Sequence, residues 1–257
     1  MAKISACIIS FNEEQKIEDC LRSLLPVVDE IIIVDSLSSD RTLEIARQYT
    51  DKIYEQKFLG HIEQKNLAVS KADNDWVLSL DCDERLTEEL QQSILDIKQT
   101  LDDFDAYSMA RKTFYVYRWL NHCWYPDTKT RLFNKHTAHW GGTNPHDRII
   151  TRGNNIRLLS GDILHYSFSS ISEHLSTIDK FTEIGADELI RKGKRFNILS
   201  PITHATWTFI KLYLFKRGFL DGFAGLVVSV LSFMHVFVKY SKAIIKRKQS
   251  SGTSGPA

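Results

Sequence analysis

Three carboxylates stand within four residues, in Asp81-Cys82-Asp83-Glu84, directly after an apolar run that begins at Trp76. Carboxylates this close repel one another, so the folded chain needs positive charge beside them. Two aspartates separated by one residue supply the oxygen ligands that Mg²⁺ and Mn²⁺ prefer, and such ions usually share their other positions with water and substrate phosphates. We therefore predict that Asp81 and Asp83 bind a divalent cation together with a diphosphate. The alternative is a solvated acidic turn that caps the helix expected to begin near Thr87.

Two further polar clusters follow apolar runs. Residues 10–14 (SFNEE) come after the first run, and residues 35–40 (DSLSSD) come after the second. If all three runs are parallel strands, their carboxyl ends lie at one edge of a sheet, where α/β proteins bind ligands. The sequence therefore predicts a polar site that draws on all three clusters.

The elements that position these clusters follow from periodicity. Short apolar runs alternate with helical patterns, which predicts right-handed βαβ units and a mostly parallel sheet in an α/β fold. The expected strands are 4–10, 30–35, 52–55 and 76–80, and the expected helices between them are 17–25, 41–49 and 61–71. A helix over 87–101 and strands over 106–117, 131–135 and 156–164 follow, with helices from Ser172 onward.

Composition excludes several classes of protein. The chain has 257 residues, 25% of them charged, and a net charge of +1, so no global basic field argues for nucleic acid binding. Neither GxGxxG nor GxxxxGK[ST] follows the first strand, so a dinucleotide or P-loop site is not expected.

The four cysteines lack paired spacing, which indicates reduced thiols. MAKISACIIS lacks a secretory pattern, so we expect a cytoplasmic protein.

The C-terminal third carries an apolar stretch. Residues 222–238 are 17 positions without formal charge apart from His235, with basic residues on both sides. A bilayer span takes about 20 residues, and cations on both flanks oppose a single crossing. We predict an in-plane helix or helical hairpin, peripheral on the inner face of the cytoplasmic membrane. The alternative is a buried helix packed on the catalytic domain or on a second subunit. The oligomeric state stays open.

Several segments together resemble family 2 glycosyltransferases. They are SACIISFNEE, IIIVDSLSSDRT, GHIEQKNLAVSKADNDWVLSLDCDERL and TRLFNK, which span about the first 150 residues in the right order. HYSFSSISEHL and KRGFLDGFAGL are similar to the lipopolysaccharide core glucosyltransferase branch, and heptose β-1,4-glucosyltransferases in particular. The resemblance implies a nucleotide-diphospho-sugar transferase fold over 1–170. The helical pattern predicts a helical extension over 171–248, and the small polar residues at the end predict a disordered tail over 249–257.

The same resemblance assigns a nucleoside pocket. It implies that Ser10, Asn12, Glu14, Asp35 and Asp40 line a uracil-ribose site, where carboxylates accept hydrogen bonds from a ribose hydroxyl or the uracil N–H. The segment after the first strand can equally cap a helix, and Asp40 has the same alternative.

Three further side chains are candidates for substrate contact. Lys65 matches a basic position that the family places near the diphosphate, with a solvated helix lysine as the alternative. Arg131 suits phosphate oxygens. Trp140 offers a face for a sugar ring, although such residues are more often core packing.

Sugar transfer with inversion needs a base for the acceptor hydroxyl. The family reads Gly-x-x-His-Glu where this chain reads Asn144-Pro145-His146-Asp147, within a glycine-rich segment that we expect to be irregular. The family's base is a carboxylate, so the resemblance favours Asp147, with His146 as the second candidate. A surface turn with an Asp147–Arg148 pair is the structural alternative.

These observations predict an inverting, metal-dependent glycosyltransferase. It would move a hexose, glucose from UDP-glucose, onto a lipopolysaccharide core or other lipid-linked saccharide. The competing classes are a nucleotidyltransferase of similar fold and a non-catalytic membrane scaffold. A nucleotidyltransferase usually carries a glycine-rich basic loop after the first strand, and SFNEE is acidic instead.

Overall fold

A computed structural model describes residues 2–143 and 146–252, without the side chains of His146, Ser251 and Gly252. The chain divides into two compact units. The first comprises Met1–Lys112 and Pro126–Tyr166, and the second comprises Thr113–Tyr125 and Ser167–Ala257.

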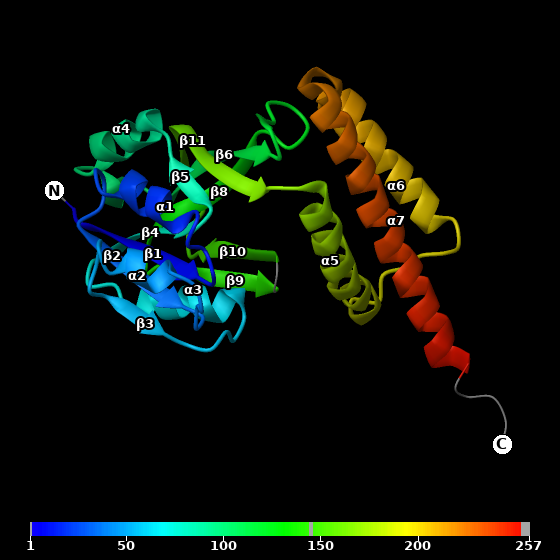
Figure 1. The fold of residues 1–257 in the computed structure, drawn as a ribbon, viewed down its shortest axis with the longest axis horizontal. Helices are drawn as coiled ribbons and strands as arrows, with labels where there is room; N and C mark the ends of the chain where they lie inside the picture. Colours follow the sequence, from blue (N-terminus) through cyan, green and yellow to red (C-terminus); the bar gives the residue numbers. More distant parts are fainter. Residues whose placement is uncertain (1, 144–145, 253–257) are drawn as a thin grey trace. The chain divides into compact units, whose positions relative to one another are not determined.

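The first unit is built on a parallel core of four strands (Figure 1). Their order in the sheet is β3 (Ile53–Glu55), β2 (Glu30–Asp35), β1 (Ile4–Ser10) and β4 (Trp76–Asp81), and each neighbouring pair is parallel. The connecting helices are α1 (Ile17–Leu24), α2 (Thr42–Ala46) and α3 (His61–Ser70). The predicted alternation of strands and helices is therefore confirmed.

Antiparallel strands extend this core beyond β4, so the sheet is mixed. The sheet continues with β8 (Asp127–Asn134), β6 (Ala106–Tyr115), β11 (Ile156–Phe168) and β5 (Glu84–Leu86), and β7 (Arg118–Trp119) pairs with β6. Between β5 and β6 lie α4 (Glu88–Ile97) and a 3₁₀ turn, η1 (Leu101–Asp103). The expected helix over 87–101 therefore ends at Ile97.

The glycine-rich segment before Asp147 corrects one expectation. Its described residues form strands: β9 (Ala138–Thr143) and β10 (His146–Thr151) pair antiparallel in a separate two-stranded sheet, while Asn144 and Pro145 lie outside the described residues. Two consecutive glycines, Gly141 and Gly142, lie inside β9 and weakened the strand pattern in the sequence. Cross-strand pairing, which local propensity does not encode, makes this segment a sheet.

The core lies on both faces of the parallel strands. Along β1, Ile4, Ala6 and Ile8 belong to a cluster with α1 and α4, whereas Cys7 belongs to a cluster with α3. This alternation is the period of two that a strand imposes on its side chains. Burial on both faces explains why these strands read as nearly continuous apolar runs in the sequence. The four cysteines are free and buried.

The second unit is mainly helical. It contains α5 (Ile171–Arg191), α6 (Ser200–Ile210), a π-helical turn η2 (Lys211–Phe215), a 3₁₀ turn η3 (Gly218–Asp221) and α7 (Gly222–Gly252). Figure 1 shows α6 and α7 side by side as an antiparallel hairpin, with η2 and η3 at its tip. Because α7 continues to Gly252, residues 249–252 are helical rather than disordered, and residues 253–257 of the expected tail lie outside the described residues.

One buried carboxylate fixes the tip of this hairpin. Asp221 is fully buried and accepts hydrogen bonds from the backbone N–H groups of Asn121, His122 and Cys123 at 2.9–3.1 Å. Burial raises the pKa of Asp221, but these hydrogen bonds together outweigh it and hold the pKa below its usual value. No local pattern predicts that residues 113–125 belong with the C-terminal helices, and these hydrogen bonds explain why they do.

Candidate active site

The acidic turn after β4 is closed by one of its own carboxylates. Glu84 is fully buried, and its Oε2 accepts the backbone N–H of Asp81 at 3.1 Å. The helix that follows is capped by Thr87, whose Oγ1 accepts the N–H of Leu90 at 3.3 Å. The carboxylates of the turn therefore do not serve as the helix cap, which was the structural alternative for this cluster.

Basic side chains from distant elements face this turn. Asp81 pairs with Lys65 of α3 at 2.9 Å through Oδ1 and with Arg131 of β8 at 3.1 Å through Oδ2. Oε1 of Glu84 pairs with Arg131 at 2.8 Å and with Arg111 of β6 at 3.1 Å. Burial raises the pKa of Asp81, but the charges of Lys65 and Arg131 outweigh it and hold the pKa well below its usual range. Asp81 is therefore ionised at neutral pH.

Asp83 has a different partner, which sequence reasoning missed. Its Oδ2 lies 3.2 Å from Nε2 of His165, near the end of β11. Asp83 directly precedes β5, and His165 stands opposite Glu84 in the β11–β5 register, which brings the two side chains together. The available signal was the segment HYSFSSISEHL, whose first residue is His165.

The predicted base is held by a buried lysine. Oδ2 of Asp147, on β10, lies 2.8 Å from Nζ of Lys65, so this lysine bridges Asp81 and Asp147. Lys65 is buried, which excludes the alternative of a solvated helix lysine. Asp147 and Arg148, both among the described residues, form no ion pair with each other. The structure therefore does not contain the surface turn with an Asp147–Arg148 pair that was the alternative. The side chain of His146, the second candidate base, is not among those described.

Trp140 lies beneath these cations. Its side chain is 3% exposed, and Nζ of Lys65 and the guanidinium carbon of Arg131 lie 4.2 and 5.3 Å from its ring centroid. Asn66, next to Lys65 on α3, exchanges two hydrogen bonds with the Trp140 backbone, at 2.8 and 3.0 Å. These bonds tie β9 to α3, so they set the position of Lys65 relative to the hairpin that carries Asp147. Trp140 is thus core packing and also supports the cations.

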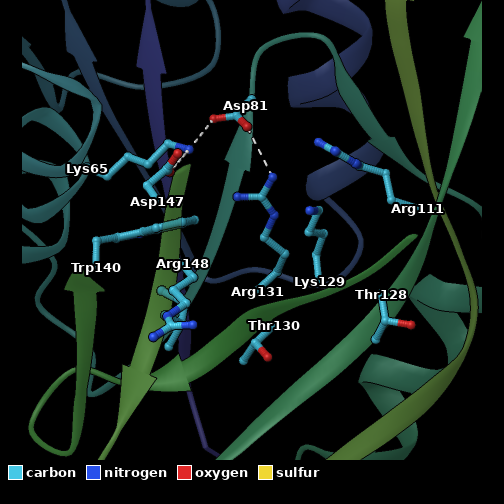
Figure 2. Close-up of a pocket in the computed structure, with 11 residues that line it drawn as sticks. Lys65, Asp81, Arg111, Thr128, Lys129, Thr130, Arg131, Trp140, Asp147 and Arg148 are labelled. Atoms are coloured by element: carbon cyan, nitrogen blue, oxygen red, sulfur yellow. Dashed lines mark hydrogen bonds and ion pairs between the residues drawn. The ribbon is translucent and has the colours of Figure 1, made fainter. Parts of the chain in front are cut away.

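Asp81, Asp147 and the cations beside them line a pocket with a cavity volume of about 590 Å³, whereas Asp83, Glu84 and His165 are not among its lining residues. Figure 2 shows Lys65 and Asp147 on one side of Asp81, Arg131 below it, and Arg111 and Lys129 on the other side. Five basic and two acidic side chains line it, together with two threonines, a tryptophan and an isoleucine: Lys65, Arg111, Lys129, Arg131, Arg148, Asp81, Asp147, Thr128, Thr130, Trp140 and Ile149. The pocket therefore suits an anionic ligand.

The predicted nucleoside residues lie at the same sheet edge but do not line this pocket. Ser10 stands opposite Asp35 in the β1–β2 register, and Ile9 stands opposite Asp81 in the β1–β4 register. Asp35 is fully buried and accepts the Ser10 hydroxyl at 2.7 Å and the N–H and hydroxyl of Ser38 at 2.7 and 2.6 Å. The three strand ends are therefore adjacent, as predicted.

The loops after β1 and β2 are bonded to each other. Oδ1 of Asn12 accepts the Ser39 N–H at 2.8 Å, and Oε2 of Glu14 accepts the Arg41 N–H at 3.1 Å. Asp40 accepts the Glu14 N–H at 3.1 Å and the Thr42 N–H at 3.0 Å, close to the start of α2. Asn12 also has a φ of 53°, a left-handed conformation that asparagine tolerates better than most residues. These contacts fix the shape of the two loops.

Replacing Arg131 by methionine is expected to lower the free energy of unfolding by about 3–5 kcal/mol, because it leaves the buried Glu84 carboxylate without one of its two cations. Lys129→Met is the matched control, since its pair with Asp127 is over one third exposed on both sides and is worth about 0–1 kcal/mol. Urea unfolding followed by circular dichroism measures both variants. Equal losses in the two would show that Arg111 alone satisfies Glu84.

Known proteins match both the sequence and this fold. Residues 5–157 match the model of the family described as Glycosyl transferase family 2. An uncharacterized glycosyltransferase of Rickettsia typhi is 33% identical over 94% of this chain and 87% of its own length. The lipopolysaccharide core biosynthesis glycosyltransferase LpsC of Rhizobium meliloti is 26% identical over 93% of this chain and 91% of its own length.

A solved structure supports the fold assignment. The crystal structure of residues 1–349 of Staphylococcus aureus TarS with UDP-GlcNAc superposes with a TM-score of 0.51 and 15% identity, over 95% of this chain and 88% of that 1–349 chain. The family match covers more than half of the chain, and the Rickettsia relative aligns along nearly all of it. On these grounds the chain belongs to glycosyl transferase family 2.

Proposed function

We propose that this glycosyltransferase is inverting and metal-dependent, and that it moves glucose from UDP-glucose onto a hydroxyl of a lipopolysaccharide core or other lipid-linked saccharide. The observation that carries the proposal is the pocket in which five cations surround Asp81 and Asp147. A nucleotide-sugar donor loses a diphosphate, and cations placed beforehand stabilise the charge that develops on this leaving group. The similarity to LpsC supports the acceptor class. The resemblance of HYSFSSISEHL and KRGFLDGFAGL to the glucosyltransferase branch supports glucose.

The residues present fit a divalent cation that is shared with the donor. Asp83 and His165 place a carboxylate oxygen and an imidazole nitrogen 3.2 Å apart, both partly exposed. Among the described residues no three His, Cys, Asp or Glu side chains form a complete metal site, so substrate phosphates and water would complete the coordination. Asp83 and His165 would then hold Mg²⁺ or Mn²⁺, and the ion would supply positive charge against the diphosphate. Both oxygens of Asp81 pair with basic side chains, so its contribution is to orient Lys65 and Arg131.

The proposed base is Asp147. Its Oδ2 is held by Lys65, and no described residue bonds to Oδ1, which leaves that oxygen for the acceptor hydroxyl. The hydroxyl oxygen attacks the anomeric carbon from the face opposite the diphosphate, and its proton passes to Asp147. The bond between the anomeric carbon and the diphosphate oxygen breaks, and UDP departs beside Arg131, so the anomeric configuration inverts.

The loops after β1 and β2 form the proposed nucleoside site. Asp35 and Ser10 are held by hydrogen bonds, and Asn12, Glu14 and Asp40 join the two loops to each other. Uracil and ribose would bind against this network, with its oxygens accepting the ligand's N–H and O–H groups. A loop that is already fixed loses less conformational entropy when the donor binds.

The proposed place of action is the inner face of the cytoplasmic membrane. A lipid-linked acceptor is confined to a leaflet, and a peripheral enzyme on that leaflet meets it there. Residues Gly218–Ser250 are long and apolar enough to cross a membrane by length and composition alone, and one third of their most apolar window is buried.

A donor screen by thermal shift, with Mn²⁺ present, tests the proposal. UDP-glucose should raise Tm, because a ligand at a hundred times its Kd stabilises the native state by about 2.7 kcal/mol. UDP-galactose and UDP-GlcNAc report sugar selectivity, and UTP with glucose 1-phosphate tests for nucleotidyl transfer. UDP release that requires a saccharide acceptor excludes the scaffold. If no UDP-sugar shifts Tm, the donor assignment fails.

A further inference from the structure

The C-terminal helix α7 is packed on one side only. Its buried residues include Ala224, Val228, Leu231 and Ala243, and it packs against α6 and α5. Towards its end, lysines pair with carboxylates of α5, for example Lys242 with Asp179 at 2.8 Å. A helix that crosses a bilayer alone, or one at the centre of a core, would present apolar surface to neighbours all round.

The other side of α7 carries an exposed apolar stripe, formed by Phe223, Val230, Met234, Phe237 and Ile245. At 100° per residue these five positions fall within an arc of about 80°, and they extend over about 33 Å of helix. Soluble proteins rarely leave so continuous an apolar surface in water.

The tip of the α6–α7 hairpin continues this surface. Trp207 and Phe215 are exposed and their rings are 5.8 Å apart, and Phe219 is exposed on η3. Three exposed cations, Lys211, Lys216 and Arg217, alternate with these rings along the chain. Tryptophan and cations beside apolar residues are the combination that favours the boundary between lipid headgroups and acyl chains.

The segment that forms this surface carries exposed charge of one sign. From Lys192 to the end of the chain the sequence contains one carboxylate, Asp221, and that carboxylate is buried and bonded to three backbone N–H groups. A second copy of the chain placed symmetrically on this face would bring like charges together, which opposes self-association. A partner that carries negative charge above an apolar layer would complement both the exposed cations and the exposed apolar stripe.

We propose that the exposed stripe of α7 and the hairpin tip together form a one-sided docking surface for an anionic phospholipid leaflet. The stripe lies among the acyl chains, and Lys211, Lys216 and Arg217 contact the phosphate groups. The hairpin lies in the plane of the leaflet and does not cross it. The inference rests on the proposed function only in the choice of leaflet, since the docking chemistry is independent of the transfer reaction.

Flotation of the full chain with vesicles tests this surface. Binding is compared between phosphatidylcholine alone and an equal mixture of phosphatidylcholine and phosphatidylglycerol. Phe215→Glu with Phe223→Glu should lower binding to the mixed vesicles more than tenfold. Removing the three cations should lower it by on the order of 100-fold, and high salt should do the same. The matched control is Leu59→Glu with Leu158→Glu, which changes two leucines of the first unit with similar exposure (64% and 61%, against 70% and 67%).

The outcomes separate the docking surface from the catalytic proposal. Selective loss in the tip and cation variants, with circular dichroism and UDP binding unchanged, supports the docking surface. Equal loss in the control, or absence of wild-type binding to anionic vesicles, overturns it. A wild-type dimer by light scattering that dissociates in the tip variant also overturns it, because the face would then bind a second copy. UDP binding is measured without vesicles, so a failure of the proposed donor is seen separately.

Discussion

Replacing Asp147 by asparagine is expected to lower the rate of sugar transfer by a factor of about 10² to 10⁴, the usual contribution of a positioned general base. Asparagine keeps the shape of the side chain but does not accept the acceptor's proton. Lys65 keeps its second partner, Asp81, so the donor side of the pocket stays in place. The affinity for UDP-glucose should therefore remain within a few-fold of wild type while kcat falls. Steady-state kinetics and a donor titration measure the two effects.

The matched control is Asp127→Asn. Asp127 is also ion-paired beside the pocket, with Arg111 at 2.7 Å and Lys129 at 3.1 Å, but the proposal gives it no proton to accept. Its substitution should leave kcat within a few-fold of wild type. Unchanged turnover in Asp147→Asn would move the base elsewhere, first to His146.

Replacing Asp83 or His165 by alanine is expected to lower transfer by about 10² to 10³, the usual cost of losing one group that stabilises developing charge. Each substitution should also weaken Mn²⁺ binding in the presence of UDP, because the two side chains would share the ion. Electron paramagnetic resonance of free Mn²⁺ measures this affinity, and it does not depend on turnover.

The surface offers a matched aspartate–histidine pair as the control. Oδ1 of Asp75 lies 2.8 Å from Nε2 of His136, with both side chains 64% exposed and outside the pocket. Alanine at either position should leave Mn²⁺ affinity and transfer unchanged. Full activity of Asp83→Ala, or of wild type after chelation of divalent ions, would refute the metal site.

The carboxylates of residues 81–84 have ion-pair partners within the protein, which we did not predict for the cluster as a whole. Each carboxylate already faces a basic or imidazole side chain: Asp81 faces Lys65 and Arg131, Glu84 faces Arg131 and Arg111, and Asp83 faces His165. The protein therefore carries fixed positive charge at the place where the donor's diphosphate is proposed to bind. Cations held in position before the donor arrives need little reorganisation during the reaction.

Hydropathy along the sequence predicts that the C-terminal helix exists but does not determine what the helix packs against. The sequence indicated an apolar helix near residues 222–238, and α7 contains it. Length and charge left three placements open: in the plane of a membrane, within a core, or against a second subunit. That α7 is packed on one side and apolar on the other emerges only from its contacts with α5 and α6.

The sequence by itself determined the parallel core and the edge where the polar clusters meet. Both follow from local patterns, because buried strands read as apolar runs and every parallel strand ends at the same side. The tertiary structure alone decided which charges meet: Lys65 and Asp147 are 82 positions apart, and Arg131 and Glu84 are 47 apart. Pairs at such separations depend on strand order and register, which long-range packing selects and a local pattern does not contain. The β9–β10 hairpin and the Asp83–His165 pair depended on tertiary structure for the same reason.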